Sequence, residues 1–344
     1  MISSPTFEPP VFADIADAAE RLRDKAVTTP LLESPLLNED LGARVLVKAE
    51  PLQRTGSFKF RGAYNNISRL GADARRRGVV AYSSGNHAQG VAAAARLLET
   101  PALIVMPKDA PAVKVANTRA WGAEIVFYDR ERDSREDVAQ RHAAERGAAL
   151  VPPYDHPMTM AGQGTVGLEL AAQAEALGAT LDAVLVPCGG GGLIAGCALA
   201  LAERAPGVPV YASEPEGFDD TARSLAAGSR ETNASGGRSF CDALLAPTPG
   251  EITFAVNRRL LAGGFAVSDD EVARAMRLAF LHLKLIIEPG GAVALAAVAS
   301  GRFDARGKTV AVVASGGNAD PEIFSRAIGN AGDRGRKAIA ETTT

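Results

Sequence analysis

A lysine between two aromatic residues is the first feature of the sequence that could do chemistry. Lys59 stands in the segment Ser57-Phe58-Lys59-Phe60-Arg61-Gly62. Aromatic neighbours remove an amine from water, which lowers its pKa and frees the neutral form to make a Schiff base with a carbonyl compound. A surface lysine that rests its stem on apolar neighbours gives the same short pattern. The segment therefore needs support from other residues.

Two further segments have the composition of anion-binding turns. Ser83-Ser84-Gly85-Asn86-His87 lies where an apolar strand gives way to a helix, and the N–H groups at a helix start attract a carboxylate. Gly189-Gly190-Gly191-Gly192 follows another apolar strand, and consecutive glycines let several N–H groups converge on one phosphate. Helix capping is the alternative explanation of the first segment. A turn without a ligand is the alternative for the second, but four glycines would then be an unnecessary loss of chain rigidity.

The glycine run also supports a nicotinamide-dependent oxidoreductase. Gly190-x-Gly192-x-x-Ala195 fits the dinucleotide fingerprint, and Glu214 stands at the end of the next strand, where an acid would bind the ribose. This alternative leaves Lys59 and the segment from Ser83 to His87 without a function.

A third turn, Ser315-Gly316-Gly317-Asn318, follows the apolar residues 310–313. In an α/β sheet, ligands bind beyond the carboxyl ends of the strands. Ser83, Gly189 and Ser315 all follow such ends, so these three turns could meet at one crevice. The alternative is an ordinary strand-to-helix turn.

Strands must alternate with helices to position these turns. Apolar runs predict strands at 79–82, 103–106, 125–128, 150–151, 184–186, 210–212 and 310–313, and helices at about 88–98, 113–121 and 134–146. Near-continuous apolar strands in such an alternation indicate parallel sheets covered on both faces. Ser268-Asp269-Asp270-Glu271 has the spacing of a capping box and predicts the start of another helix.

Composition excludes several classes of protein. The 344 residues are 47% hydrophobic, which is enough apolar content for two domains. The net charge of −3 gives no basic field that would attract nucleic acid or a membrane surface. Cys188, Cys197 and Cys241 are too few and too scattered for a disulfide framework or a zinc site. A cytoplasmic protein without a signal peptide or a membrane helix is expected.

The segments together resemble the fold-type II pyridoxal-phosphate enzymes, and within them the threonine/serine dehydratases and serine racemase. The segments around Lys59, Asn86, the four glycines and Ser315 occur in the order of that family, with support from Ala161 to Thr165 and Ile287 to Ala292. The resemblance spans about residues 15–325. It implies a two-domain α/β fold like the tryptophan synthase β subunit, with parallel twisted sheets flanked by helices.

The resemblance also implies a role for each site residue. Lys59 would bind pyridoxal phosphate covalently and later remove the Cα proton, with Phe58 beside the cofactor ring and Asn86 bonded to the ring's 3′-oxygen. Gly189, Gly190, Gly191 and Gly192 would hold the phosphate, and Ser315 would face the pyridine nitrogen. Ser83, Ser84, Asn86 and His87 would bind the substrate.

The implied reaction is β-elimination of a small β-hydroxy amino acid, which releases a 2-oxo acid and ammonia. Threonine or serine is the expected substrate, and 3-hydroxyaspartate and phenylserine stay open. Ser84 matches a serine that acts opposite the lysine in racemase-like members, so serine or hydroxyaspartate racemisation is a further alternative. Cys241-Asp242-Ala243 departs from the usual Ala-Asp-Gly, which leaves the substrate pocket open.

The same resemblance implies a metal site, an assembly and a division into domains. Glu214, Phe218 and Asp220 match the positions where some relatives hold Mg²⁺ or Ca²⁺, and oxygen ligands suit such cations. A homodimer is expected. Residues 1–75 and 158–330 would form the large cofactor-binding domain, residues 76–157 the small domain, and residues 331–344 a frayed tail.

Overall fold

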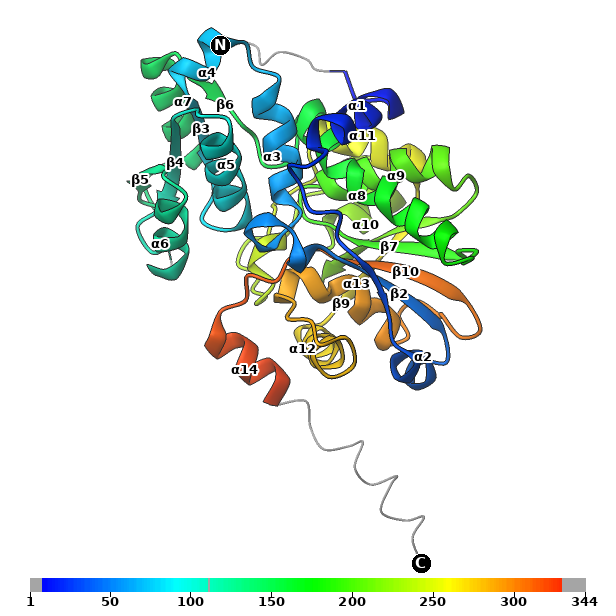
Figure 1. The fold of residues 1–344 in the computed structure, drawn as a ribbon. Coiled ribbons are helices and arrows are strands. Elements are labelled where there is room, and N and C mark those ends of the chain that lie inside the picture. The colour runs from blue at the N-terminus through cyan, green and yellow to red at the C-terminus, as the bar shows by residue number, and fades with distance from the viewer. Residues whose placement is uncertain (1–7, 111, 330–344) are drawn as a thin grey trace, which may run out of the picture.

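The computed structural model describes residues 8–110 and 112–329, which form two sheets with helices packed on both (Figure 1). The larger sheet has the strand order β1-β2-β10-β7-β8-β9 and the smaller one β5-β4-β3-β6. Within the described residues, all neighbouring strands are parallel except β1 and β2. The predicted α/β fold with parallel sheets is confirmed.

The strands are short, and several coincide with the predicted apolar runs. Their bounds are β1 Leu31–Glu33, β2 Arg44–Ala49, β3 Val79–Tyr82, β4 Ala102–Pro107, β5 Glu124–Tyr128, β6 Ala149–Leu150, β7 Ala183–Pro187, β8 Val210–Pro215, β9 Leu261–Val267 and β10 Thr309–Ala314. The prediction missed β1, β2 and β9.

The helices fill the intervals between the strands. Their bounds are α1 Phe12–Leu22, α2 Pro35–Leu41, α3 Lys59–Ser68, α4 Ala72–Arg77, α5 Asn86–Leu97, α6 Ala112–Ala120, α7 Arg135–Arg146, α8 Pro157–Ala176, α9 Gly192–Arg204, α10 Asp220–Ala227, α11 Glu251–Leu260, α12 Asp269–Leu278, α13 Pro289–Ala299 and α14 Pro321–Gly329. The predicted capping box is present, because Ser268 accepts from the Glu271 N–H and the Glu271 carboxylate accepts from the Ser268 N–H.

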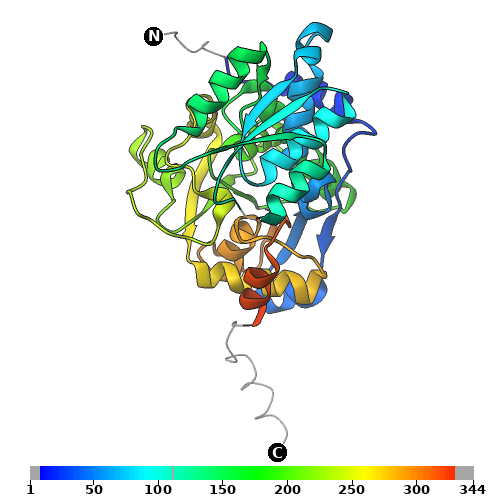
Figure 2. The same cartoon turned by 90° about the vertical axis from the view of Figure 1, so that its left-hand side faces the viewer.

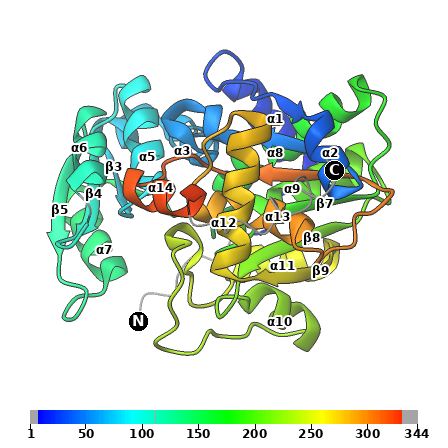
Figure 3. The same cartoon turned by 90° about the horizontal axis from the view of Figure 1, so that it is seen from below.

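Alternate residues of each strand face opposite layers, which is how a two-sided sheet buries its side chains. In the larger sheet, Val45 and Val47 pack toward α12 and α13, whereas Leu46 packs toward α8 and α9. Figure 3 shows α12 and α13 on the underside of this sheet. In the smaller sheet, Val79 faces α5 and Val80 faces α7. Figure 2 shows the molecule from the side on which this sheet lies.

Helix α3 lies between the two sheets and packs against both α5 and α8. Glycines on α8 permit this close approach. A Cβ on Gly162 would lie 2.5 Å from the Arg61 carbonyl oxygen of α3, and one on Gly167 would lie 2.8 Å from the Cys197 Cα of α9. The helix that begins at Lys59 is therefore held firmly against its neighbours.

Two predictions about organisation are not decided by this architecture. The smaller sheet is built from residues 79–150, but the domain boundaries at 76 and 157 stay a prediction. The predicted frayed tail, residues 331–344, lies outside the described residues. Within the described part, no helix is both long enough and apolar enough to cross a bilayer.

Candidate active site

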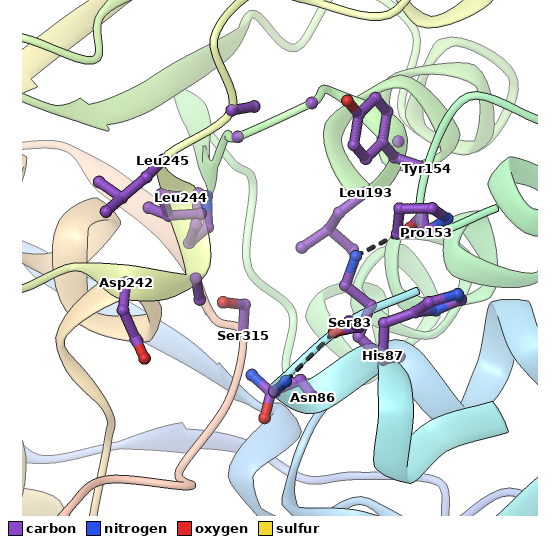
Figure 4. Close-up of a pocket in the computed structure, with 18 of the residues that line it drawn as sticks. Ser83, Asn86, His87, Pro153, Tyr154, Leu193, Asp242, Leu244, Leu245 and Ser315 are labelled. Atoms are coloured by element: carbon purple, nitrogen blue, oxygen red, sulfur yellow. Dashed lines mark hydrogen bonds between the residues drawn. The ribbon is translucent and has the colours of Figure 1, made fainter. Parts of the chain in front are cut away.

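One pocket lies at the carboxyl ends of strands from both sheets, and the predicted cofactor and substrate residues line it. The predicted residues in its wall are Phe58, Lys59, Ser83, Ser84, Asn86, His87, Gly189, Gly190, Gly191, Gly192 and Ser315. In Figure 4, Asn86 and His87 lie on one side of the pocket, and Asp242 and Leu244 lie on the other. Segments that lie far apart along the chain thus meet around a single pocket.

The Lys59 amine points into this pocket from the first residue of α3. Its Nζ donates a hydrogen bond to the Pro153 carbonyl oxygen at 2.8 Å and lies 5.1 Å from the centre of the Phe58 ring. Burial lowers the pKa of Lys59 to about 8, although nearby Glu288 favours the charged form. The amine is thus within reach of its neutral, nucleophilic form near neutral pH.

A buried group of charges anchors the helix that carries Lys59. The Arg61 guanidinium donates to the carboxylates of Glu50 and Glu169 at 2.6–2.9 Å. Lys48 also bonds Glu169, at 2.6 Å, and its side chain is fully buried. Removing one member of such a buried pair costs about 3–5 kcal/mol, because the partner charge is left uncompensated. These contacts tie α3 to β2 and α8 and so fix where the amine points.

The four-glycine turn has the shape of a phosphate cradle. Gly191 adopts φ +92°, a conformation that favours glycine, and no side chain caps α9 behind it. The Gly190 carbonyl oxygen accepts a hydrogen bond from the Thr253 hydroxyl at 2.7 Å. The Gly191 N–H lies anti to this carbonyl across the planar trans peptide, and Gly191 itself lines the pocket. The Tyr154 ring packs so closely on Gly190 that a Cβ there would overlap it.

The turn before α5 can bind a carboxylate through its backbone. No side chain caps the start of this helix, so its first N–H groups stay available for an anion. His87 cannot add a charge there. Its Nε2 bonds the Val151 carbonyl oxygen at 2.8 Å, and burial lowers its pKa to about 3. The imidazole is therefore neutral across the physiological range.

Asn86 and Ser315 both line the pocket, and each is bonded to residues of a neighbouring segment. The Asn86 amide bonds Glu288 through Nδ2 and Asn318 through Oδ1. The Ser315 carbonyl oxygen accepts from the Phe58 N–H at 3.1 Å, which joins the turn after β10 to the lysine segment. Burial raises the pKa of Glu288 to about 7, and nearby Asp242 acts in the same direction.

The charged or aromatic residues of the pocket wall that were not predicted include Lys114, Arg135, Tyr154, Asp242 and Glu288. Lys114 and Asp242 form an ion pair. Arg135 opens α7, with its guanidinium carbon 5.5 Å from the centre of the Tyr82 ring. In the sequence these residues stand in ordinary polar helices and loops, so no local pattern separates them from surface charges. Glu288 and Asp242 carried a signal, because Glu288 belongs to a supporting segment of the family and Asp242 to the segment that departs from the family's Ala-Asp-Gly.

The predicted metal residues lie outside this pocket wall. The Glu214 carboxylate accepts from the N–H groups of Thr221 and Ala222 at 2.9 and 2.8 Å, so it caps α10. Asp220 accepts from the Asn233 amide through Oδ1, while its Oδ2 is buried without a partner.

The residues of the pocket fit pyridoxal phosphate. A desolvated lysine can take the aldehyde, and a glycine turn at a helix start can take the phosphate. An uncharged amide and a serine are available for the ring. This combination of a parallel α/β fold and a lysine-bearing crevice defines a cofactor-dependent enzyme class rather than a simple binding module.

Comparison with known proteins agrees with the geometry. The chain belongs to the pyridoxal-phosphate dependent enzyme family, whose pattern matches residues 22–316. It is 42% identical to L-threo-3-hydroxyaspartate ammonia-lyase of Saccharomyces cerevisiae over 93% of this chain and 96% of that protein. It is 44% identical to the enzyme of the same name from a Pseudomonas species over 91% and 97%.

Among solved structures, a threonine deaminase superimposes with a TM-score of 0.85 at 45% identity, covering 90% of this chain and 99% of that one. The serine racemase of maize superimposes with a TM-score of 0.87 at 35% identity, covering 98% and 100%. The chain is therefore an enzyme of the pyridoxal-phosphate-dependent ammonia-lyase and racemase group. This membership decides against the nicotinamide-dependent alternative.

Proposed function

We propose that this enzyme eliminates the β-hydroxyl of 3-hydroxyaspartate and releases oxaloacetate and ammonia. The observation that carries the choice of substrate is Arg135, a cation in the wall of the pocket. The helix start at α5 already offers a site for the α-carboxylate, so a further cation suits a substrate with a second carboxylate. The two hydroxyaspartate-acting relatives support the same choice.

The position of Arg135 favours an acidic substrate over threonine or serine. Its side chain is 41% exposed and its Nε bonds Glu136 on its own helix, which leaves the terminal guanidinium N–H groups available to a ligand. It also stands over Tyr82, the residue before Ser83. A hydrogen bond to a charged group contributes about 1.5–3 kcal/mol, and the exposure of Arg135 places the expected gain at the lower end. The methyl group of threonine, or the hydrogen that serine has in its place, carries no charge, so these substrates would gain no such hydrogen bond to Arg135.

The chemistry divides between the cofactor and the chain. Pyridoxal phosphate supplies an electron sink that acidifies the Cα–H bond of a bound amino acid. Lys59 holds the cofactor and then moves the Cα proton, for which a pKa near the working pH is suited. The N–H groups before α5 orient the α-carboxylate, and the glycine turn fixes the phosphate. Together they align the Cα–H bond with the lysine.

A panel of β-hydroxy amino acids tests this proposal. The purified holoenzyme would be given both threo isomers of 3-hydroxyaspartate, L-threonine, L-serine and phenylserine, with ammonia and 2-oxo acids measured. The highest kcat/KM is expected for a 3-hydroxyaspartate isomer, with oxaloacetate as the product. A higher kcat/KM for threonine or serine would refute the choice of substrate. No ammonia from any of them, in a protein that still holds its cofactor, would refute the lyase activity itself.

Racemisation is the second candidate activity, and Ser84 is the residue that favours it. Its side chain belongs to a pocket that also contains Lys59, so two proton-transferring groups could serve one Cα atom. Incubation with L-serine, followed by chiral separation, would reveal D-serine if this side activity is present. No D-serine above a heat-killed control would eliminate it.

We also propose that Glu214, Asp220 and the Phe218 carbonyl bind Mg²⁺ or Ca²⁺. The partnerless Asp220 Oδ2 supports this assignment. Burial and the nearby Asp220 raise the pKa of Glu214 to about 8, and burial raises that of Asp220 to about 6. Two buried carboxyls that resist ionisation are what a divalent cation would relieve.

The melting temperature should respond to the cation in a pH-dependent way. In the cation-free protein, both carboxyls bind protons more tightly when folded, so the free energy of unfolding falls as pH rises from about 4 to 8. A saturating cation offsets this loss, and we expect Ca²⁺ or Mg²⁺ to raise the melting temperature by several degrees, more at pH 8 than at pH 6. Asp220→Asn should abolish the response, whereas Glu216→Gln on the exposed neighbouring residue should keep it. No cation response at either pH would refute the site.

Assembly and compartment remain proposals. We propose a homodimer in the cytoplasm. Phe280, Leu281, Ile286 and Ile323 are large apolar side chains that are 36–50% exposed, which is typical of surfaces that a partner covers. Sedimentation at micromolar concentration would test the dimer, and a monomer would refute it.

A further inference from the structure

The Asn86 amide is held on both sides by residues outside the smaller sheet. Its Oδ1 accepts a hydrogen bond from Asn318 Nδ2 at 2.7 Å, and its Nδ2 donates to Glu288 Oε1. Asn318 follows β10, Glu288 precedes α13, and Asn86 opens α5 of the smaller sheet. The Asn86 amide, which lines the pocket, is thus held between two turns of the larger sheet.

A chain of donors and acceptors fixes which way this amide points. Asn318 Nδ2 also donates to the Thr55 carbonyl oxygen at 2.7 Å. A backbone carbonyl can only accept, so the Asn318 atom between Thr55 and Asn86 must be the nitrogen. The Asn86 atom that meets it must then be the oxygen, and the Asn86 NH₂ group must face Glu288 and the pocket. One of its two N–H groups bonds Glu288, and the other stays available.

Close packing prevents the chain from relaxing into another arrangement. A Cβ on Gly56 would lie 2.6 Å from Asn318 Oδ1, and Gly56 has φ +72°. A Cβ on Gly316 would overlap the Glu288 carboxylate and lie 3.2 Å from Asn86 Nδ2. The Gly317 N–H donates to the Gly56 carbonyl oxygen at 2.9 Å. The turn before Lys59 and the turn after β10 therefore hold Asn318 in one place.

We propose that Asn318 is a positioning residue that orients the Asn86 amide so that its free N–H meets the 3′-oxygen of the cofactor ring. This inference rests on membership of the cofactor family and on the proposed role of Asn86, and not on the choice of substrate. A donor held at that oxygen stabilises its anionic form. The stabilised 3′-oxygen then attracts less strongly the proton that it shares with the Lys59 nitrogen. Losing the donor should make that nitrogen more basic.

Asn318→Asp tests the orientation directly, because it keeps the shape and replaces the donor with an acceptor. Two acceptors would then oppose each other, and the Asn86 amide would turn its oxygen toward the cofactor. The pH midpoint of the visible absorbance of the bound cofactor should rise by about one unit, and the cofactor Kd should weaken by about tenfold, each the equivalent of about one hydrogen bond. Both readings are taken without substrate.

Asn318→Ala separates the lost donor from the added charge. It is neutral, and it should raise the midpoint in the same direction by about half as much, because the Asn86 amide is freed rather than reversed. Asn38→Asp on α2 makes the same chemical change at an amide that donates to Glu33 instead and should leave the midpoint and the Kd unchanged. If Asn318→Asp fails to fold, the alanine variant decides.

Two results would overturn the inference. The first is a folded Asn318→Ala protein with an unchanged pH midpoint, because any effect of Asn318→Asp would then come from the added charge alone. The second is a weaker Kd with an unchanged midpoint in both variants, which is what a purely structural role predicts. A wrong choice of substrate would appear only in the amino acid panel and would leave these midpoints untouched.

Discussion

Replacing Lys59 with alanine is expected to lower kcat by about a thousandfold or more on every substrate of the panel. The reason is that, in the proposed mechanism, one amine both holds the cofactor and moves the Cα proton, and positioned acid–base groups alone contribute about 10²–10⁴-fold. Borohydride should fix the cofactor to the wild-type chain at Lys59 and leave the variant unlabelled, as peptide mass analysis would measure. Lys108→Ala removes a lysine that is 67% exposed and should change neither result.

The pH dependence of cofactor loading adds an independent check on the same amine. Burial lowers the pKa of Lys59 to about 8, so a small share of the amine is neutral at pH 7 and most of it is neutral at pH 9. Because only the neutral amine attacks the aldehyde, the rate at which the cofactor-free protein binds pyridoxal phosphate should rise with pH, with a midpoint near 8. A rate that is flat between pH 7 and 9 would contradict this assignment of the reactive group.

The sequence could predict those parts of the site that would bind their ligand through backbone N–H groups. The four glycines and the Ser83–His87 turn identify themselves because anion binding by N–H groups requires particular residue types at the end of a strand. The strands that carry them, β3, β7 and β10, are almost entirely apolar because both faces of a parallel sheet are covered. Local pattern and long-range structure agree at these positions.

In the elements that were not predicted, the local sequence pattern and the long-range structure do not agree. Strand β9 contains two adjacent glycines, Gly263 and Gly264, which depress strand propensity. A Cβ on Gly264 would lie 2.9 Å from that of Ala222 on α10, so close packing against this helix explains that glycine. Likewise the glycines of α8 resemble loop residues in sequence, although they allow three helices to approach. Tertiary contacts that glycine permits leave no periodic signal along the chain.

The pocket wall that faces the substrate side chain could not be predicted for a different reason. Arg135 and Lys114 reach the pocket from α7 and α6 of the smaller sheet, and Asp242 reaches it from a turn before α11. Their meeting point depends on how the two sheets are packed, which no single segment encodes. The substrate was therefore left open by motifs that already indicated the cofactor.

Replacing Arg135 with methionine is expected to change the choice of substrate rather than abolish catalysis. Methionine keeps an unbranched stem over Tyr82 and removes the charge. We expect kcat/KM for 3-hydroxyaspartate to fall by about tenfold, the equivalent of one charge-assisted hydrogen bond at a partly exposed site. The kcat/KM for threonine and serine should stay within about threefold, because their side chains carry no carboxylate. Arg141→Met on the exposed side of the same helix should change neither.

The split between substrates is what separates this role from its alternatives. If Arg135 instead bound the α-carboxylate, which all the substrates share, the variant would lose hydroxyaspartate and threonine activity by the same factor. If it only supported α7, the melting temperature would fall and the ratio between substrates would be preserved.

The salt dependence of KM distinguishes the proposed role further. A partly exposed arginine that attracts a dianionic substrate is screened within about 10 Å at 0.1 M salt. Added salt should therefore raise the wild-type KM for 3-hydroxyaspartate more than that for threonine, and Arg135→Met should abolish this difference.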